Sequence, residues 1–330
     1  MLRSLKGASR LAAGLLVASG LFGGSAALAQ QKVRVALGDV VSEETLAFQI
    51  ALERAKERGL DYELTSFSEE ELAIQSIISG QMDIGIGTPY AVIQRTKVPL
   101  RIIFQLSTLV FYPVVANEYQ TWKDLDGQPF TFHGRGSGTE AIGNIIAARE
   151  GITFGDRSYV PGSGNRVIAL MNGTIKATIL DLSNKNILMQ QAGDRFHVLP
   201  TPEERASDEV VFASQKWLDE NPEQANILVE ELLKLWREMN EDPSVVERER
   251  EARNLLADQP KEVIEEVPAY YTEGVKEGLF DPNGGGAEAA KTDFDFYIQA
   301  GQLEGDPASL KVEDFWDMRP LENARQKLGN

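Results

Sequence analysis

The sequence predicts an α/β fold made of two lobes. Segments that alternate apolar and polar residues are followed in turn by segments of helical periodicity, the pattern of parallel strands joined by helices. With 330 residues, of which 42% are hydrophobic, the chain exceeds the usual size of one core and can bury two. The phrase GQMDIGIGT at 80–88 has the same frame as GTIKATILD at 173–181, so each lobe is expected to contain a similar unit.

The first lobe is expected to alternate strands and helices from its start. Gly38 ends the first strand, Ser42 caps the helix that follows, and Gly59 and Gly80 stop the first two helices. The expected strands are 32–37, 62–67, 82–88 and 101–107, and the expected helices are 42–58 and 68–79. The segment VFYPVVAN at 110–117 is predicted to be an extended crossing between the lobes.

A second, smaller set of alternating elements follows. Its expected strands are 129–133, 157–160 and 176–181, and its expected helices are 138–150 and 165–172. The run VVFAS at 210–214 is predicted to return the chain to the first lobe, and helices are expected from Pro222 onward, with Leu228, Leu232, Leu235 and Trp236 facing a core. The predicted bounds are 1–29 for a signal peptide, 30–117 for the first part of lobe 1, 118–207 for lobe 2, and 208–330 for the return to lobe 1 and the C-terminal helices.

The N-terminus predicts export. Arg3, Lys6 and Arg10 precede an apolar stretch of 14 residues, and Ala27 and Ala29 have the spacing of a signal-peptidase site. The chain contains no cysteine, which excludes disulfides, thiolate metal sites and a lipid-modified N-terminal cysteine. We therefore expect a periplasmic protein that is not a lipoprotein.

The composition is strongly acidic. Removing the three cations of the signal peptide takes the formal charge from −17 to −20, which makes nucleic acid and anionic membranes poor partners. Acid pairs at 69–71, 203–204 and 230–231 are interpreted as solvated helix faces.

Catalytic and cofactor motifs are weak or missing in the sequence. Gly136, Gly138 and Ala141 fit a dinucleotide fingerprint only loosely, there is no P-loop, and Arg135 stands where a hydrolase elbow needs glycine. His133 and His197 have no metal-ligand spacing around them. We expect no metal, no cofactor and no enzyme activity.

The stretch FHGRGSGTEAIGN at 132–144 places glycines where a strand passes into a helix. Helix N-termini carry unpaired N–H donors and a partial positive charge, so Ser137, Gly138, Thr139 and Arg135 suit a carboxylate, sulfonate or phosphate. An alternative is that Ser137 or Thr139 only caps the helix. The stretch at 162–166 repeats the arrangement, with Ser163, Asn165 and Arg166 as candidates of second rank.

Further candidates follow the ends of other predicted strands, where open α/β sheets bind ligands. They are Asp39 and Val40, then Thr88, Pro89 and Tyr90, then Asp181 and Asn184, while Phe111 and Tyr112 could form a wall of the cleft.

These phrases together resemble a known family. The succession KVRVALGD, SIISGQMDIGIGTPYAVIQ, WKDLDGQPFTFHGRGSGTEAI and IALMNGTIKATILD is similar to periplasmic substrate-binding proteins of ABC transporters, in the sulfonate, nitrate, taurine and thiamine-precursor group. The resemblance implies a two-lobed type II periplasmic binding fold with an interlobe ligand cleft. It places ligand contacts at Asp39 and Val40, at 88–90, at 137–139 and around Asp181, although Lys176 stands where the family has an acid.

The function expected from this resemblance is that of a monomeric receptor. It would capture a small organic anion and deliver it to an ABC-type membrane permease. The GSGTE phrase at 136–140 also resembles receptors of TRAP transporters of the TAXI type. A periplasmic ligand-sensing accessory protein and an enzyme similar to thiamine-precursor synthases are the remaining alternatives.

Overall fold

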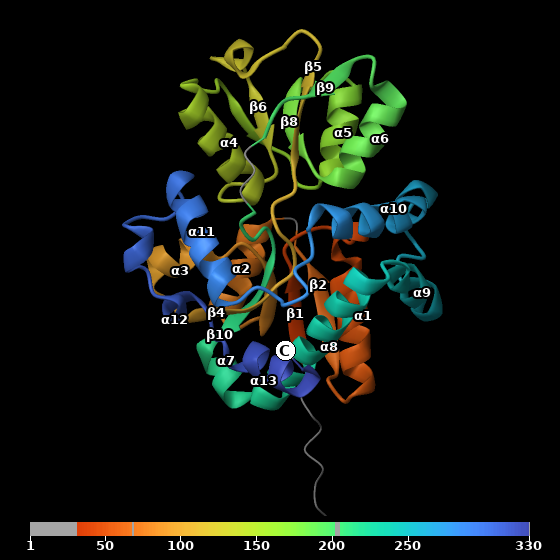
Figure 1. Cartoon of the computed structure of the whole chain (residues 1–330), viewed down its shortest axis with the longest axis vertical. Coiled ribbons are helices and arrows are strands. Elements are labelled where there is room, and N and C mark those ends of the chain that lie inside the picture. Colours follow the sequence, from red (N-terminus) through yellow and green to blue (C-terminus); the bar gives the residue numbers. More distant parts are fainter. Residues whose placement is uncertain (1–31, 68, 202–204, 330) are drawn as a thin grey trace, which may run out of the picture. The chain divides into compact units, whose positions relative to one another are not determined.

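Two five-stranded sheets organise the chain in this computed structural model (Figure 1). The structure describes residues 32–67, 69–201 and 205–329. The predicted signal peptide and its cleavage site lie outside these residues, as do Glu203 and Glu204. Within the described ranges, no helix combines the length and the apolar character that a membrane span requires.

The first sheet has the order β2-β1-β3-β10-β4, and all five of its strands were predicted. Strands β1, β2 and β3 pair in parallel, while β10 lies antiparallel between β3 and β4. The C-terminal ends of the parallel strands therefore meet at one edge. The bounds are Val33–Leu37 for β1, Tyr62–Ser66 for β2, Ile84–Gly87 for β3, Leu100–Gln105 for β4 and Val210–Ser214 for β10.

The second sheet repeats this arrangement in the order β7-β6-β8-β5-β9. Strands β7, β6 and β8 are parallel, and β5 is antiparallel to β8 and β9. The phrases at 80–88 and 173–181 supply β3 and β8, which occupy the same central position in the two sheets. The bounds are Tyr112–Ala116 for β5, Phe130–Phe132 for β6, Arg157–Tyr159 for β7, Ala177–Leu180 for β8 and Phe196–Val198 for β9.

Two strands of the second sheet differ from expectation. The predicted crossing segment forms β5, which pairs on both sides, and β9 was not predicted. The predicted boundary at 117 thus falls after a strand of the second sheet. Contacts group residues 32–330 as a single unit, so the domain bounds as a whole stay a prediction. Below, the elements around the first sheet are called the first lobe, and those around the second sheet the second lobe.

Helices cover both sheets, and the C-terminal helices reach both lobes (Figure 1). The helices of the first half are α1 (Glu43–Glu57), α2 (Glu70–Ile78), α3 (Tyr90–Thr96), η1 (Trp122–Leu125), α4 (Gly138–Glu150), α5 (Ser163–Met171) and α6 (Leu182–Ala192). Those of the second half are α7 (Gln215–Glu220), α8 (Pro222–Glu241), α9 (Ser244–Arg253), α10 (Lys261–Glu277), α11 (Ala287–Gln299), η2 (Pro307–Ser309), α12 (Val312–Phe315) and α13 (Arg319–Leu328).

Helix α8 shows how the sequence pattern determines packing. The predicted core-facing stripe is buried, with Leu228, Leu232 and Leu235 at 0% exposure and Trp236 at 1%. The Trp236 Nε1 donates a hydrogen bond of 2.9 Å to the carbonyl of Leu106, just after β4. The stripe therefore anchors α8 beside the point where the chain leaves the first sheet.

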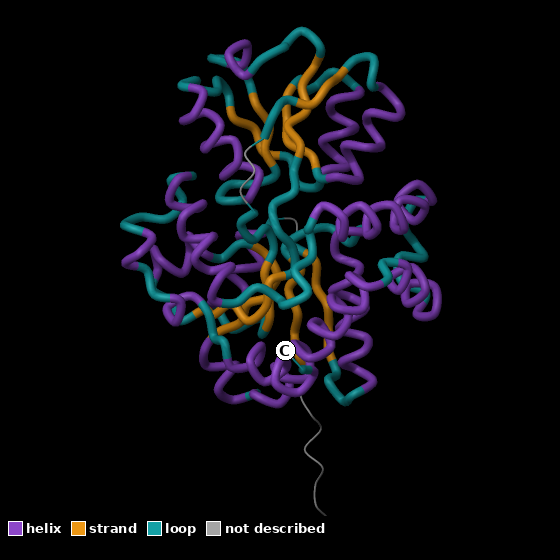
Figure 2. The backbone as a smooth tube through the Cα atoms, in the orientation of Figure 1, coloured by secondary structure: helices purple, strands orange, loops and turns teal. Residues whose placement is uncertain are grey.

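The two lobes are joined by loops, drawn in teal in Figure 2. One runs from the end of β4 at 105 to β5 at 112, and the other, which includes residues 202–204, from β9 at 198 to β10 at 210. The described parts of these connections contain no helix or named strand, although Thr108 and Ser207 pair through an isolated antiparallel bridge. Outside this bridge the connections can change their backbone angles without breaking a regular element.

Candidate functional site

The two lobes face each other across a cavity of about 50 Å³, enough for about four water molecules. Five helices start at its wall: α1 and α2 from the first lobe, and α4, α5 and α6 from the second. The lining residues are Asp39, Glu44, Glu70, Thr88, Ser107, Val110, Phe111, His133, Ser137, Gly138, Thr139, Ser163, Arg166, Asp181, Leu182, Asp208, Glu209, Tyr270 and Leu279.

The glycine-rich stretch at 134–140 begins α4, as predicted, and its polar groups satisfy one another. The Ser137 side chain caps the helix and donates a 2.8 Å hydrogen bond to the carbonyl of Gly134. The Thr139 hydroxyl accepts the backbone N–H of His133 at 3.0 Å. The Gly136 N–H donates to a carboxylate oxygen of Glu140 at 2.8 Å. The capping alternative that the sequence left open is therefore realised, and Glu140 occupies the Gly136 amide.

Gly138 is the point of closest approach between α4 and the connecting loops. A Cβ at this position would lie 2.3 Å from Leu109 Cδ2 and 2.7 Å from Asp208 Oδ1. Glycine therefore lets the start of α4 contact both connections between the lobes.

Replacing Gly138 with alanine should lower the free energy of unfolding by about 1–3 kcal/mol, because the added methyl group must displace Leu109 or Asp208. Gly134→Ala is a matched control, since nothing lies within 4 Å of the added Cβ there. Thermal or chemical unfolding of both variants checks this. Equal stability of the two variants would show that the contact at Gly138 is not tight in solution.

The second lobe contributes a buried arginine at the start of α5. Arg166 is 0% exposed, and its guanidinium donates to the carbonyls of Val160 and Ile179 at 2.9 and 3.2 Å and to the Ser163 hydroxyl at 2.7 Å. The same hydroxyl accepts the N–H of Asp181 at 3.4 Å, and Asp181 caps α6. Arg166 thus ties together the ends of β7 and β8 and the start of α5.

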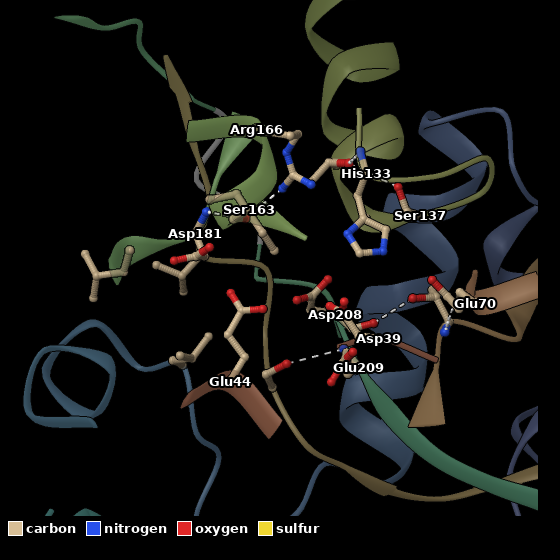
Figure 3. Close-up of a pocket in the computed structure, with 18 of the residues that line it drawn as sticks. Asp39, Glu44, Glu70, His133, Ser137, Ser163, Arg166, Asp181, Asp208 and Glu209 are labelled. Carbon is tan, nitrogen blue, oxygen red and sulfur yellow. Dashed lines mark hydrogen bonds between the residues drawn. The ribbon is translucent and has the colours of Figure 1, made fainter. Parts of the chain in front are cut away.

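Carboxyl groups of the first lobe and of the loop before β10 form the opposite wall (Figure 3). Glu44 extends from the first turn of α1 toward Asp181 of the second lobe. Glu70, the first residue of α2, accepts the backbone N–H of Thr88. Asp208 and Glu209 lie between the lobes, and the Thr88 hydroxyl holds the Asp208 carbonyl at 2.8 Å.

Crowding and burial shift the protonation of this wall. Burial raises the pKa of Glu70 to about 7, against its hydrogen bonds with Thr88. Burial, followed by the charges of neighbouring carboxyls, raises the pKa of Glu44, Asp208 and Glu209 well above the usual range. Burial lowers the pKa of His133, so the imidazole is held in its neutral form. The free cavity therefore holds protons that a positively charged group would displace.

Nine of the sequence-predicted candidates line this cavity: Asp39, Thr88, Phe111, Ser137, Gly138, Thr139, Ser163, Arg166 and Asp181. That they contact a ligand stays a prediction. The other candidates are not part of the lining. Val40 is 46% exposed, Pro89 precedes α3, and Tyr90 is 1% exposed with its hydroxyl on Asp293. Asn184 donates to the Asp181 carboxylate, and Asn165 donates to the Pro161 carbonyl. Tyr112 begins β5, and Arg135 lines a neighbouring hollow with its guanidinium 4.5 Å from the Tyr159 ring.

Four of the carboxyls were missed by sequence reasoning: Glu44, Glu70, Asp208 and Glu209. The interpretation of acid pairs as solvated faces is wrong for Glu70, and also for Glu230 and Glu231, which are 8% and 7% exposed. The available signal was position: Glu44 and Glu70 fall in the first turns of helices that follow sheet strands, and Asp181 caps the start of another such helix. Within the described residues, no group of three or more His, Asp or Glu side chains has an arrangement that could hold a metal ion.

The chain matches a known family model. A family model described as NMT1/THI5 like matches residues 55–245, which is more than half of the chain. The chain belongs to the NMT1/THI5-like family. Among curated proteins, no sequence matches it significantly. The predicted membership of the group that includes thiamine-precursor and sulfonate binders is confirmed.

Solved structures share the fold. A protein from Bordetella bronchiseptica RB50 superposes with a TM-score of 0.74 at 19% identity, over 91% of this chain and 98% of that one. The periplasmic nitrate-binding protein from Synechocystis gives 0.66 at 13% identity, over 90% and 89%. A periplasmic sulfonate-binding protein from Methylobacillus flagellatus gives 0.61 at 18% identity, over 90% and 94%. This NMT1/THI5-like chain therefore has the predicted periplasmic binding fold.

Proposed function

We propose that this chain is a periplasmic receptor that holds a small solute between its lobes and delivers it to an ABC-type membrane permease. The observation that carries the proposal is the polar cavity, which is enclosed by two sheets of matching topology and by the starts of five helices. Family membership and the ABC-type neighbours support the same function, and the TAXI-type alternative gains no support from them.

A receptor must open to admit its solute. A cavity of about 50 Å³ is too small for most organic molecules, so entry requires the lobes to part. Side-chain bonds across the opening include Asn144 to the Ala300 carbonyl at 3.1 Å, Gln302 to the Ser137 carbonyl at 3.3 Å, and Asn186 to Glu273 at 2.8 Å. Each is a polar contact that water can replace at a cost of about 1 kcal/mol. Closure is therefore easy to reverse, as delivery to a permease requires.

The proposal also includes a periplasmic location and binding without catalysis. The predicted signal peptide and the periplasmic neighbours support a place in the periplasm. His133, a candidate base, makes a structural hydrogen bond instead: its Nδ1 accepts the backbone N–H of Gly162 at 3.4 Å. The chain is proposed to bind rather than transform its solute.

Closure on a solute can be measured directly because the chain lacks native cysteine. Ala148→Cys on α4 and Lys216→Cys on α7 place one exposed label on each lobe. Single-molecule energy transfer should show an open and a closed population, and some members of a library of anionic, neutral and cationic solutes should raise the closed fraction. If one unchanging distance persisted with every solute, the receptor function would be rejected.

A further inference from the structure

We propose that the solute held in this cavity is a small organic cation carrying protonated amine or amidinium groups, in contrast to the oxyanions named for the neighbouring structures. The inference rests on the proposed function and specifies its ligand class. It departs from the anionic ligand expected from the sequence, for physical reasons that concern the charge balance of the wall and its unpaired acceptors.

The charge balance of the wall is negative even when the helix termini are counted. Six carboxyl groups line the cavity against one guanidinium, that of Arg166. Five helix N-termini add about half a positive charge each. Full ionisation would leave about two and a half uncompensated negative charges, and an anion would add to them. A cation with one to three charges would balance them.

Asp208 and Glu209 are independent evidence that a partner is expected. Both residues are partly buried, and they border the cavity. Within the described part of the chain, neither side chain accepts a hydrogen bond or joins an ion pair, although the backbone groups of both residues are bonded. A carboxyl that is largely shielded from water and has no donor is costly, and a donor supplied by a ligand would remove that cost.

The charged donor of the wall is already occupied. The Arg166 guanidinium donates to two backbone carbonyls and to Ser163, and the Thr88 N–H donates to Glu70. An anion would therefore be left with helix-terminal amides and would lie among six carboxyls. The charged groups that the cavity presents to a ligand are mainly acceptors.

The apolar part of the wall narrows the class further. Val110, Phe111, Leu182, Tyr270 and Leu279 border the same space as the carboxyls. Such side chains favour carbon over a hydrated metal ion or ammonium. An aliphatic chain that carries charged nitrogen groups matches both the apolar side chains and the carboxyls of the wall.

Binding of a cation should release protons. In the free protein, the pKa values of Glu44, Glu70, Asp208 and Glu209 are raised, first by burial, while Asp39, Asp181, Arg166 and His133 face the same cavity. A bound cation favours the ionised carboxyls and lowers these pKa values. Affinity therefore rises with pH while the free carboxyls still hold protons, and Glu70 titrates at about pH 7.

The test is calorimetric titration of the full mature chain with putrescine, 1,4-butanediol and methanesulfonate, with calcium chloride as a further probe. The diol matches the diamine in length but has no charge. We expect putrescine to bind at least about tenfold more tightly than the diol, to gain about tenfold or more in affinity from pH 6 to pH 8, and to release protons. Methanesulfonate should give no heat of binding.

Asp208→Asn separates a ligand contact from a structural role. Asparagine resembles the protonated form of Asp208, which its raised pKa favours in the free protein. The variant should therefore be about as stable as the parent, yet bind putrescine about tenfold or more weakly. Glu63→Gln on β2 removes an exposed charge from the same lobe, and its affinity should stay within about twofold. An Asp208→Asn variant with unchanged affinity would overturn the inference.

The remaining outcomes distinguish this inference from the proposed function. Binding of methanesulfonate, of calcium alone, or of the diol as tightly as the diamine would overturn the cationic ligand class and leave a solute receptor standing. If no probe bound, and the labelled protein also failed to close with any solute of the library, both proposals would fall.

Discussion

The unliganded protein should become less stable as the pH rises from about 5 to about 8. Burial raises the pKa of Glu70 and Glu43 to about 7 and that of Asp293 to about 6, from ordinary values of 4.5, 4.5 and 3.8. Between the ordinary and the raised values the folded state holds more protons than the unfolded state, so stability falls with rising pH. With several such groups, we expect a loss of about 2 kcal/mol or more across the window.

Two other titratable groups, His133 and Asp219, change the stability of the protein with pH in the opposite direction or in another pH range. Burial lowers the pKa of His133, which alone would make stability rise with pH below about 6.5. A hydrogen bond from Arg319 lowers the pKa of Asp219, and that contribution is lost only below about pH 4. Neither effect cancels the loss of stability caused by Glu70, Glu43 and Asp293 between pH 5 and pH 8.

Thermal unfolding at pH 5, 6, 7 and 8 checks this profile, with Glu70→Gln as the variant. Glutamine can still accept the Thr88 N–H, so the variant should fold, and its melting temperature should fall less with pH than that of the parent. A melting temperature that rises steadily from pH 5 to pH 8 in the parent would contradict the raised pKa values.

Replacing Arg166 with methionine should lower the free energy of unfolding by about 3–5 kcal/mol. The change leaves the carbonyls of Val160 and Ile179 without their donor and removes the cation among the carboxyls of the cavity. Each orphaned buried acceptor alone costs about 1–3 kcal/mol.

Arg95→Met is the matched control for this substitution, because Arg95 is exposed and its Nε donates only to the carbonyl of Ala91 within its own helix. Its expected cost is below about 1 kcal/mol. Urea unfolding of both variants gives the comparison. A similar loss of unfolding free energy at the two positions would mean that the hydrogen bonds of Arg166 contribute no more to stability than those of an exposed arginine.

The sequence predicts most of the fold because periodicity and glycine stops are local signals. Eight of the strands follow runs identified by alternation or apolar content, and the stripe of α8 is buried as expected. Strand β5 was predicted only as an extended crossing, and β9 was not predicted. The two strands pair with each other although they lie some eighty residues apart in the chain, and a pairing at that distance leaves no local signal in the sequence.

The charge of the cavity could not be predicted from composition. Glu44, Glu70, Asp181 and Asp208 are separated by up to 164 positions, and the chain contains 50 acidic residues, most of which serve the surface. Sequence reasoning identified the glycine-rich start of α4 as an anion site from its N–H donors. It could not foresee that Glu140 would take the Gly136 amide, or that Asp208 would lie against Gly138.

Proteins that share this fold can bind ligands of different charge. The neighbouring structures include nitrate- and sulfonate-binding proteins, which share the fold at 13–18% identity. At that distance the position of the cleft can persist while its lining changes, because the fold places the site and a few side chains determine what it accepts. The carboxyl-rich wall is a property of this chain's own residues.

Native mass spectrometry of the exported full chain, recovered from cells grown in rich medium without denaturation, tests the central claim most directly. It should show one small molecule per chain, which carries positive charge once released and is strongly reduced in Asp208→Asn but retained in Glu63→Gln. A chain that carries no small molecule under these conditions, or one whose bound molecule is an anion unaffected by Asp208→Asn, would contradict a receptor that captures organic cations in this cavity.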